Sequence, residues 1–224
     1  MRDNPRSIDT IGKQVYTILR DDISNGVYPA GYWLQENELA NTLKVSRSPV
    51  REALRRLVAD RLVVAMPNKG IFIRKFTAKD IQEIFDVRLM LETYAVLHLP
   101  PKLSPSETAP LTICLDNLCK THKANNLKKY IAYDSDLHNI IVNLCDNTLV
   151  HSIYEQVYIL INQFRIYSLK DTIRFDKSVG EHERFIGNII AGNYKKAASI
   201  NEEHLKLAKE KIIEYLEMQN HDHP

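Results

Sequence analysis

Helical periodicity over the C-terminal two thirds of the chain restricts its fold more than any other feature. From residue 77 to residue 218, apolar side chains recur at the three- and four-residue steps of one helix face. Only 7 glycines among 224 residues also favours helices. Breaks at Pro, Asn, Asp or Gly separate six expected helices, at about 77–99, 107–121, 126–145, 147–169, 171–191 and 193–218. The sequence therefore predicts an antiparallel all-α helical bundle.

The N-terminal third has a different pattern. Apolar residues between Ile8 and Ile23 predict one amphipathic helix, and "LQENELANTLKV" predicts a second, shorter one. The third expected helix is "SRSPVREALRRLVADRL", which follows after a tight connection. Two strands, 62–66 and 71–74, are expected on either side of the turn "PNKG". This order predicts a winged helix-turn-helix domain at 1–76 and an all-helical domain at 77–224, in a mostly α protein.

The positions of the charges indicate how this first domain would meet DNA. The N-terminal residues of a recognition helix enter the major groove, where arginine binds guanine through two hydrogen bonds. A wing tip approaches the minor groove or the phosphates. The expected DNA-binding residues are therefore Ser46, Arg47, Ser48, Arg51, Lys69 and Gly70. An arginine-rich helix alone could be a solvated charged face, and the net charge of only +2 gives no support to DNA binding. The preceding helix and the wing favour DNA.

The stretch "GVYPAGYWLQENELANTLKVSRSPVREALRRLVADRLVVAMPNKGIFI" resembles the winged-helix domain of the GntR family of bacterial transcription regulators. The resemblance covers nearly the whole domain, and its "SRSPVREAL" core is highly specific. Most members carry an arginine where this sequence has Asn37, and that arginine usually contacts a guanine. Asn37 is therefore expected to read an adenine or no base. A homodimer would place two recognition helices on a palindromic double-stranded DNA operator.

Histidines in the second domain suggest a metal site. Asp134 and His138 are four residues apart and so project from one face of a helix. His182 and His204 lie on two later helices, and bundle cores build metal sites from facing helices. One aspartate with three histidines suits Zn, Ni, Mn or Fe rather than Mg or Ca. The chain has 8 histidines, so ordinary helix histidines remain the alternative.

Residues 77–217 resemble the FCD effector domain of the FadR subfamily of GntR regulators. Metal-binding members place an Asp and a His four apart and two further His 22 positions apart on the last two helices, as this sequence does. The resemblance implies a metal centre and a small carboxylate effector. It also implies an effector-binding arginine on the first helix, which Arg88 matches. A helix pair between Arg88 and Glu92 is the alternative, and Arg165 and Arg184 are further candidate effector ligands.

These features together predict a metabolite-responsive transcription regulator, which the resemblance implies is a repressor, and not an enzyme. Two alternatives remain. In the first, the metal is structural or is itself the signal; in the second, it activates water in a hydrolase. The three cysteines lack CxxC spacing, and neither a signal peptide nor a membrane span is apparent. A cytoplasmic protein without a membrane partner is expected.

Overall fold

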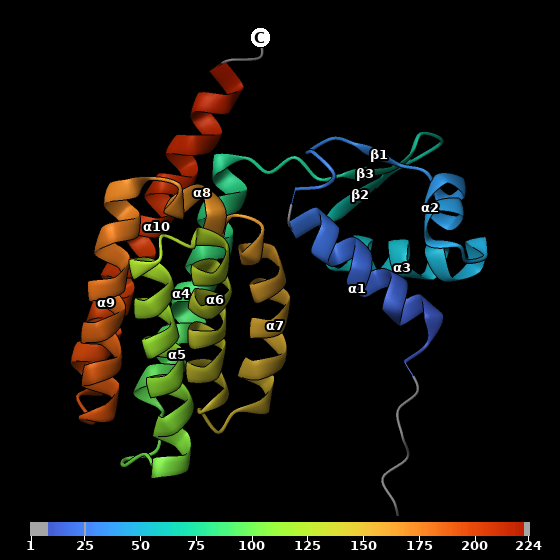
Figure 1. Ribbon diagram of the computed structural model, residues 1–224. Coiled ribbons are helices and arrows are strands. Elements are labelled where there is room, and N and C mark those ends of the chain that lie inside the picture. Colours follow the sequence, from blue (N-terminus) through green and yellow to red (C-terminus); the bar gives the residue numbers. More distant parts are fainter. Residues whose placement is uncertain (1–8, 25, 222–224) are drawn as a thin grey trace, which may run out of the picture. The chain divides into compact units, whose positions relative to one another are not determined.

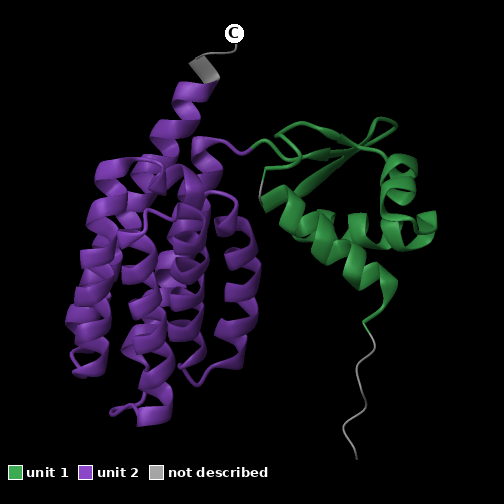
Figure 2. Cartoon of the chain, in the orientation of Figure 1, with its two compact units in different colours: residues 1–75 green, residues 76–224 purple. Residues whose placement is uncertain are grey.

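The computed structural model describes residues 9–24 and 26–221. The chain forms two compact units, and the boundary along the chain lies between Lys75 and Phe76 (Figure 2). The sequence placed this boundary between residues 76 and 77. No helix within the described ranges is long and apolar enough to cross a membrane.

The first unit is a winged helix-turn-helix (Figure 1). Its helices are α1 (Ile11–Ser24), α2 (Glu36–Leu43) and α3 (Arg47–Ala59), and its strands are β1 (Trp33–Leu34), β2 (Val63–Met66) and β3 (Gly70–Ile73). The antiparallel sheet has the order β1-β3-β2, and the strand β1 was not predicted from the sequence. The buried side chains of Leu19 and Leu54 belong to α1 and α3, which pack together. Lys44 ends α2 in the left-handed conformation and turns the chain toward α3.

The second unit is a bundle of helices, as the sequence predicted (Figure 1). Its helices are α4 (Ala78–Leu97), α5 (Pro105–Lys123), α6 (Leu127–Asn143), α7 (Thr148–Asn162), α8 (Arg165–Leu169), α9 (Thr172–Ile190) and α10 (Tyr194–His221). Polar caps begin several of them; Thr77 and Asp80 form a capping box at the start of α4. The largest apolar core cluster takes its buried residues mainly from α5, α6 and α9.

The prediction of one helix over 147–169 is wrong. The helix α7 ends at Asn162, and the short helix α8 begins at Arg165. Phe164, between them, is buried in a cluster with residues of α4 and α10 and meets the ring of Phe76 edge to face at 4.8 Å. The break thus directs Phe164 into that cluster and places Arg165 where it pairs with Asp134 of α6.

Candidate metal centre

The four residues predicted to bind metal lie together inside the helical unit. Asp134 and His138 come from α6, His182 from α9 and His204 from α10. One ligand atom from each lies within 4.8 Å of those of the other three, and all four side chains are buried. The helices therefore supply one carboxylate and three imidazoles to a single point in the core.

Hydrogen bonds on the far side of each ring turn the histidines toward that point. The contacts are Glu92 Oε2 with His138 Nδ1 at 2.9 Å, Glu181 Oε2 with His204 Nδ1 at 2.8 Å, and Tyr130 Oη with His182 Nδ1 at 3.3 Å. A neutral ring whose Nδ1–H donates to a carboxylate leaves its Nε2 lone pair for a metal. Nε2 of His138 is buried and has no hydrogen-bond partner among the described residues; Nε2 of His182 is also buried, and it lies 3.2 Å from Oδ1 of Asp134, a second candidate ligand, without a well-aligned hydrogen bond. Buried polar atoms are rarely left in this way, so these two nitrogens fit a bound metal ion.

The charges of the site also suit a transition metal. Burial lowers the pKa of His138 to about 4, so this ring is neutral at neutral pH. Burial, together with the charges of His182 and Arg174, holds the pKa of His204 well below its usual range. Burial alone would raise the pKa of Asp134, but Arg165, His182 and His138 together outweigh it and hold that pKa well below its usual range. Neutral imidazoles and an ionised carboxylate are the forms that bind metal.

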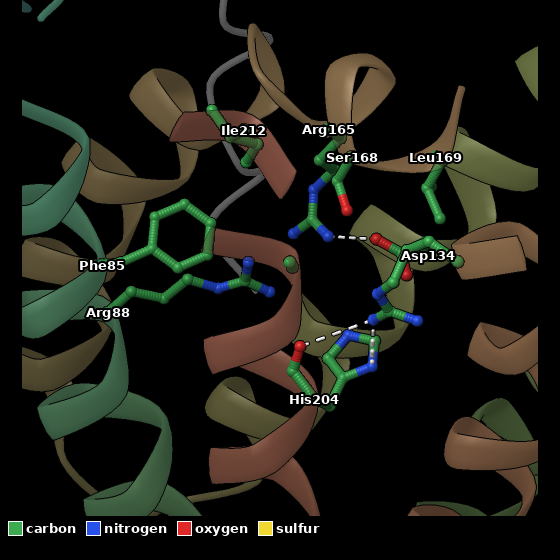
Figure 3. Close-up of a pocket in the computed structure, with 10 residues that line it drawn as sticks. Phe85, Arg88, Asp134, Arg165, Ser168, Leu169, His204 and Ile212 are labelled. Carbon is green, nitrogen blue, oxygen red and sulfur yellow. Dashed lines mark hydrogen bonds and ion pairs between the residues drawn. The ribbon is translucent and has the colours of Figure 1, made fainter. Parts of the chain in front are cut away.

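A pocket rich in arginine lies directly beside this cluster (Figure 3). It is lined by Phe85, Arg88, Asp134, Arg165, Ser168, Leu169, Arg174, His204, Ala208 and Ile212. Nη2 of Arg88 and Nη2 of Arg165 are buried and lack a hydrogen-bond partner among the described residues. The cavity volume of about 20 Å³ leaves room for about one water molecule, so a larger ligand can enter only if side chains move.

Three effector-binding arginines were expected, and the structure brings two of them to this pocket. Arg88 lines the pocket and also pairs with Glu92 at 2.7 Å, so the alternative helix pair is present, and effector binding by Arg88 stays a prediction. Arg165 lines the pocket and pairs with Asp134. Arg184 is exposed and does not line it, because two residues of helix separate it from His182 by about 200° around the axis. Arg174, which no sequence pattern indicated as an effector ligand, is the third arginine that lines the pocket.

The residues expected to bind DNA lie on the surface of the first unit. All of them are exposed: Asn37, Ser46, Arg47, Ser48, Arg51, Lys69 and Gly70. Ser46 precedes α3 and Arg47 opens it, and Arg47 Nη1 lies 3.4 Å from Asn37 Oδ1. Arg51 is held by Glu36, with Nη2 at 2.8 Å from Oε2, and this hydrogen bond lowers the pKa of Glu36. The structure thus leaves Arg47 facing Asn37, while a carboxylate engages Arg51.

Comparison with known proteins agrees with both units. The profile "Bacterial regulatory proteins, gntR family" matches residues 11–73, and the profile "FCD domain" matches residues 83–207. The chain is 33% identical over 189 residues to the HTH-type transcriptional regulator YdhC of Bacillus subtilis, covering 83% of each protein. It is 27% identical to the gluconate operon transcriptional repressor of Bacillus licheniformis, covering 78% of this chain and 74% of the repressor.

Solved structures share the folds of the two units. A GntR transcriptional regulator from Rhodococcus sp. RHA1 superposes with a TM-score of 0.78 at 26% identity, covering 90% of this chain and 97% of that one. The metal-free FCD domain of TM0439 covers 64% of this chain and 99% of its own, with a TM-score of 0.55 at 22% identity. The chain belongs to the GntR family of bacterial regulatory proteins and is a DNA-binding transcriptional regulator with an FCD domain, not an enzyme.

Proposed function

We propose that this regulator is a repressor whose operator binding is controlled by a small organic acid bound beside a divalent transition metal: Zn, Ni, Mn or Fe. The observation that carries the proposal is that Asp134 and His204 are candidate metal ligands and also line the arginine-rich pocket. A carboxylate in the pocket would therefore reach the metal and the guanidinium groups at once. Arginine is the side chain best suited to hold a carboxylate in this way.

The balance of charge favours an anion. Each arginine of the pocket already has a carboxylate partner; the pairs are Arg88 with Glu92, Arg165 with Asp134, and Arg174 with Glu181. A divalent metal would therefore add positive charge that these residues do not offset. In a buried site such a charge is costly unless it is paired, so an acidic ligand would stabilise the loaded centre.

The chemical class of the acid follows from the pocket and from the relatives. The cavity is small, and its arginines would bind a carboxylate rather than an apolar molecule. Two relatives, 27% and 28% identical to this chain, are gluconate operon repressors of Bacillus species. Gluconate, a hydroxylated carboxylic acid, is therefore the first effector to test.

The proposed mechanism is allosteric. Because the cavity is too small for an organic acid, the acid must displace the side chains that line it. A helical bundle whose core side chains have moved adopts a different packing. In a homodimer on a palindromic operator, that change would alter the spacing of the two recognition helices. Acid and operator would then each change the affinity of the other.

The test uses an operator obtained by in vitro selection and the metal-loaded full-length protein. Fluorescence anisotropy measures operator affinity with and without gluconate and a panel of other small acids. We expect one of them to weaken operator binding by about 5- to 150-fold. The Arg88→Lys variant, which keeps the charge but loses the planar fork, should lose most of this response. Arg184→Lys is the matched control, because Arg184 is exposed, and should respond like wild type.

The same anisotropy measurement, repeated after removal of the metal and combined with a melting curve, distinguishes the proposal from the remaining alternative, a regulator whose metal is structural or is itself the signal. If no acid changes operator affinity while removal of the metal does, the metal is the signal and the carboxylate effector is wrong. If metal removal lowers only the melting temperature, the metal is structural.

A further inference from the structure

Glu92 on α4 is a buried carboxylate that receives four hydrogen bonds. It is only 2% exposed. Its Oε1 accepts from Arg88 Nε at 2.7 Å and from Tyr154 Oη at 2.8 Å; its Oε2 accepts from Asn201 Nδ2 at 2.8 Å and lies 2.9 Å from His138 Nδ1. The donors come from α4, α7, α10 and α6 respectively. Glu92 therefore joins four helices of the bundle at one carboxylate.

The two oxygens of Glu92 face different parts of the site. The Oε2 atom faces His138, whose Nδ1–H can donate to it while Nε2 points into the ligand cluster. A partner that accepts from the outer nitrogen of a histidine fixes both the tautomer and the orientation of the ring. The Oε1 atom holds Arg88 by its Nε, and Nη2 of Arg88 remains without a hydrogen-bond partner beside the pocket.

Glu181 on α9 repeats this arrangement on the other side of the cluster. Its Oε2 lies 2.8 Å from His204 Nδ1 and 2.9 Å from Arg174 Nη1. Arg174 Nη2 also lies 3.0 Å from His204 Nδ1, but a guanidinium group cannot accept a hydrogen bond. Glu181 is therefore the neighbour that can take the ring hydrogen and leave Nε2 of His204 for a metal. Glu92 thus links Arg88 to His138, and Glu181 links Arg174 to His204, so each glutamate joins one pocket arginine to one candidate metal ligand.

We infer that Glu92 and Glu181 are the positioning residues of the metal centre, each holding one histidine in the tautomer and orientation that presents Nε2 to the ion. This inference rests on the metal centre of the proposed function. The same carboxylates hold Arg88 and Arg174, so the orientation of the ligand rings and of the acid-binding arginines has a common support.

A purely structural role makes a different prediction. If Glu92 only neutralised buried Arg88, then removing any one hydrogen bond to Glu92 would disturb the site to a similar extent. Tyr154→Phe supplies this comparison, because it deletes one buried hydrogen bond to Oε1 and leaves the Oε2 side with His138 unchanged. Glu92→Gln keeps the size of the side chain, but its amide both donates and accepts and so no longer selects one tautomer of His138.

The experiment measures Zn²⁺ affinity of the full-length protein by calorimetry against a competing chelator. Glu92→Gln should bind Zn²⁺ about 10- to 100-fold more weakly than wild type, the usual effect of losing such a partner. Tyr154→Phe should stay within about twofold of wild type. Nitrogen-15 spectra of the imidazole rings provide a second readout: His138 should be a single Nδ1–H tautomer in wild type and in Tyr154→Phe, and a mixture in Glu92→Gln.

A second pair of variants protects the test against misfolding of Glu92→Gln. Glu181→Gln alters the less deeply buried carboxylate and should weaken Zn²⁺ binding through His204. Glu183→Gln is its matched control on the exposed face of α9 and should bind like wild type. Equal Zn²⁺ affinity in wild type, Glu92→Gln and Glu181→Gln, with unchanged tautomers, would overturn the inference alone. A wild-type protein that binds no Zn²⁺, Ni²⁺ or Mn²⁺ would overturn the metal centre and this inference with it.

Discussion

Arg47 is the residue on which specific DNA recognition should depend most. It opens α3, its side chain is exposed, and its guanidinium lies near Asn37 and forms no ion pair with the residues that the structure describes. Arg51, one turn later, is engaged by Glu36 in the free protein. A bidentate contact between arginine and guanine contributes about 1 to 3 kcal/mol of discrimination against the wrong base.

We therefore expect Arg47→Ala to lower operator affinity about 10- to 100-fold while binding to unrelated DNA falls much less. Footprinting and anisotropy on the selected operator measure both quantities. Arg20→Ala is the control, because Arg20 lies on α1 and pairs with its neighbour Asp21. A footprint on the operator that is unchanged in Arg47→Ala would exclude Arg47 from base recognition.

Single residues differed in how well the sequence predicted them. Asp134 and His138 could be selected because a spacing of four defines a helix face, whereas Glu92, Arg174 and Glu181 were missed. A signal existed: Glu92 continues the buried stripe of Phe85 and Arg88 at helical steps, which places a polar residue in the core. A charged residue on an apolar stripe needs a partner, and the sequence alone does not show which one.

Among the secondary-structure elements, the wing depends on the conformation of one glycine. Gly70 has a φ of +112°, and a Cβ added to it would lie 2.4 Å from Nε1 of Trp33 on β1. The indole of Trp33 in turn stacks on Phe72 of β3. Any side chain at residue 70 would therefore strain the backbone and displace the indole.

Gly70→Ala should destabilise the first unit by more than about 1 kcal/mol and weaken operator binding. Trp33 is the only tryptophan of the chain, so its fluorescence reports the displacement directly. Gly26→Ala is the matched control, because Gly26 also has a positive φ, +74°, but nothing lies within 4 Å of an added Cβ. Equal fluorescence and equal operator affinity in the two variants would show that the contact with Trp33 is not the reason why residue 70 must be glycine.

The elements that the sequence failed to predict share a cause. The segment that separates α7 from α8 contains neither Gly nor Pro, so its local pattern is that of an uninterrupted helix. Tertiary contacts impose the break, through burial of Phe164 and the pairing of Arg165 with Asp134. The strand β1 has only two residues, too few for an alternating pattern, and forms because β3 lies beside it.

At the scale of the whole molecule, the proposed mechanism makes a reciprocal prediction. If an acid weakens operator binding by a given factor, saturating operator must weaken binding of that acid by the same factor. Calorimetric titration of the metal-loaded protein, free and bound to the operator, measures the second factor. Two factors that clearly differ would mean that the acid acts at some other species, such as free metal in solution.

The most direct test of the proposed metal centre is the metal content of the purified protein, measured by inductively coupled plasma mass spectrometry. Wild type is compared with the double variant His182→Ala, His204→Ala and with a control, His98→Ala, His151→Ala, that removes two imidazoles outside the site. We predict about one transition metal ion per chain in wild type and control, and loss of that ion in the first variant. Equal metal content in all three proteins, or none in wild type after incubation with Zn²⁺, Ni²⁺ and Mn²⁺, would contradict the proposed metal centre.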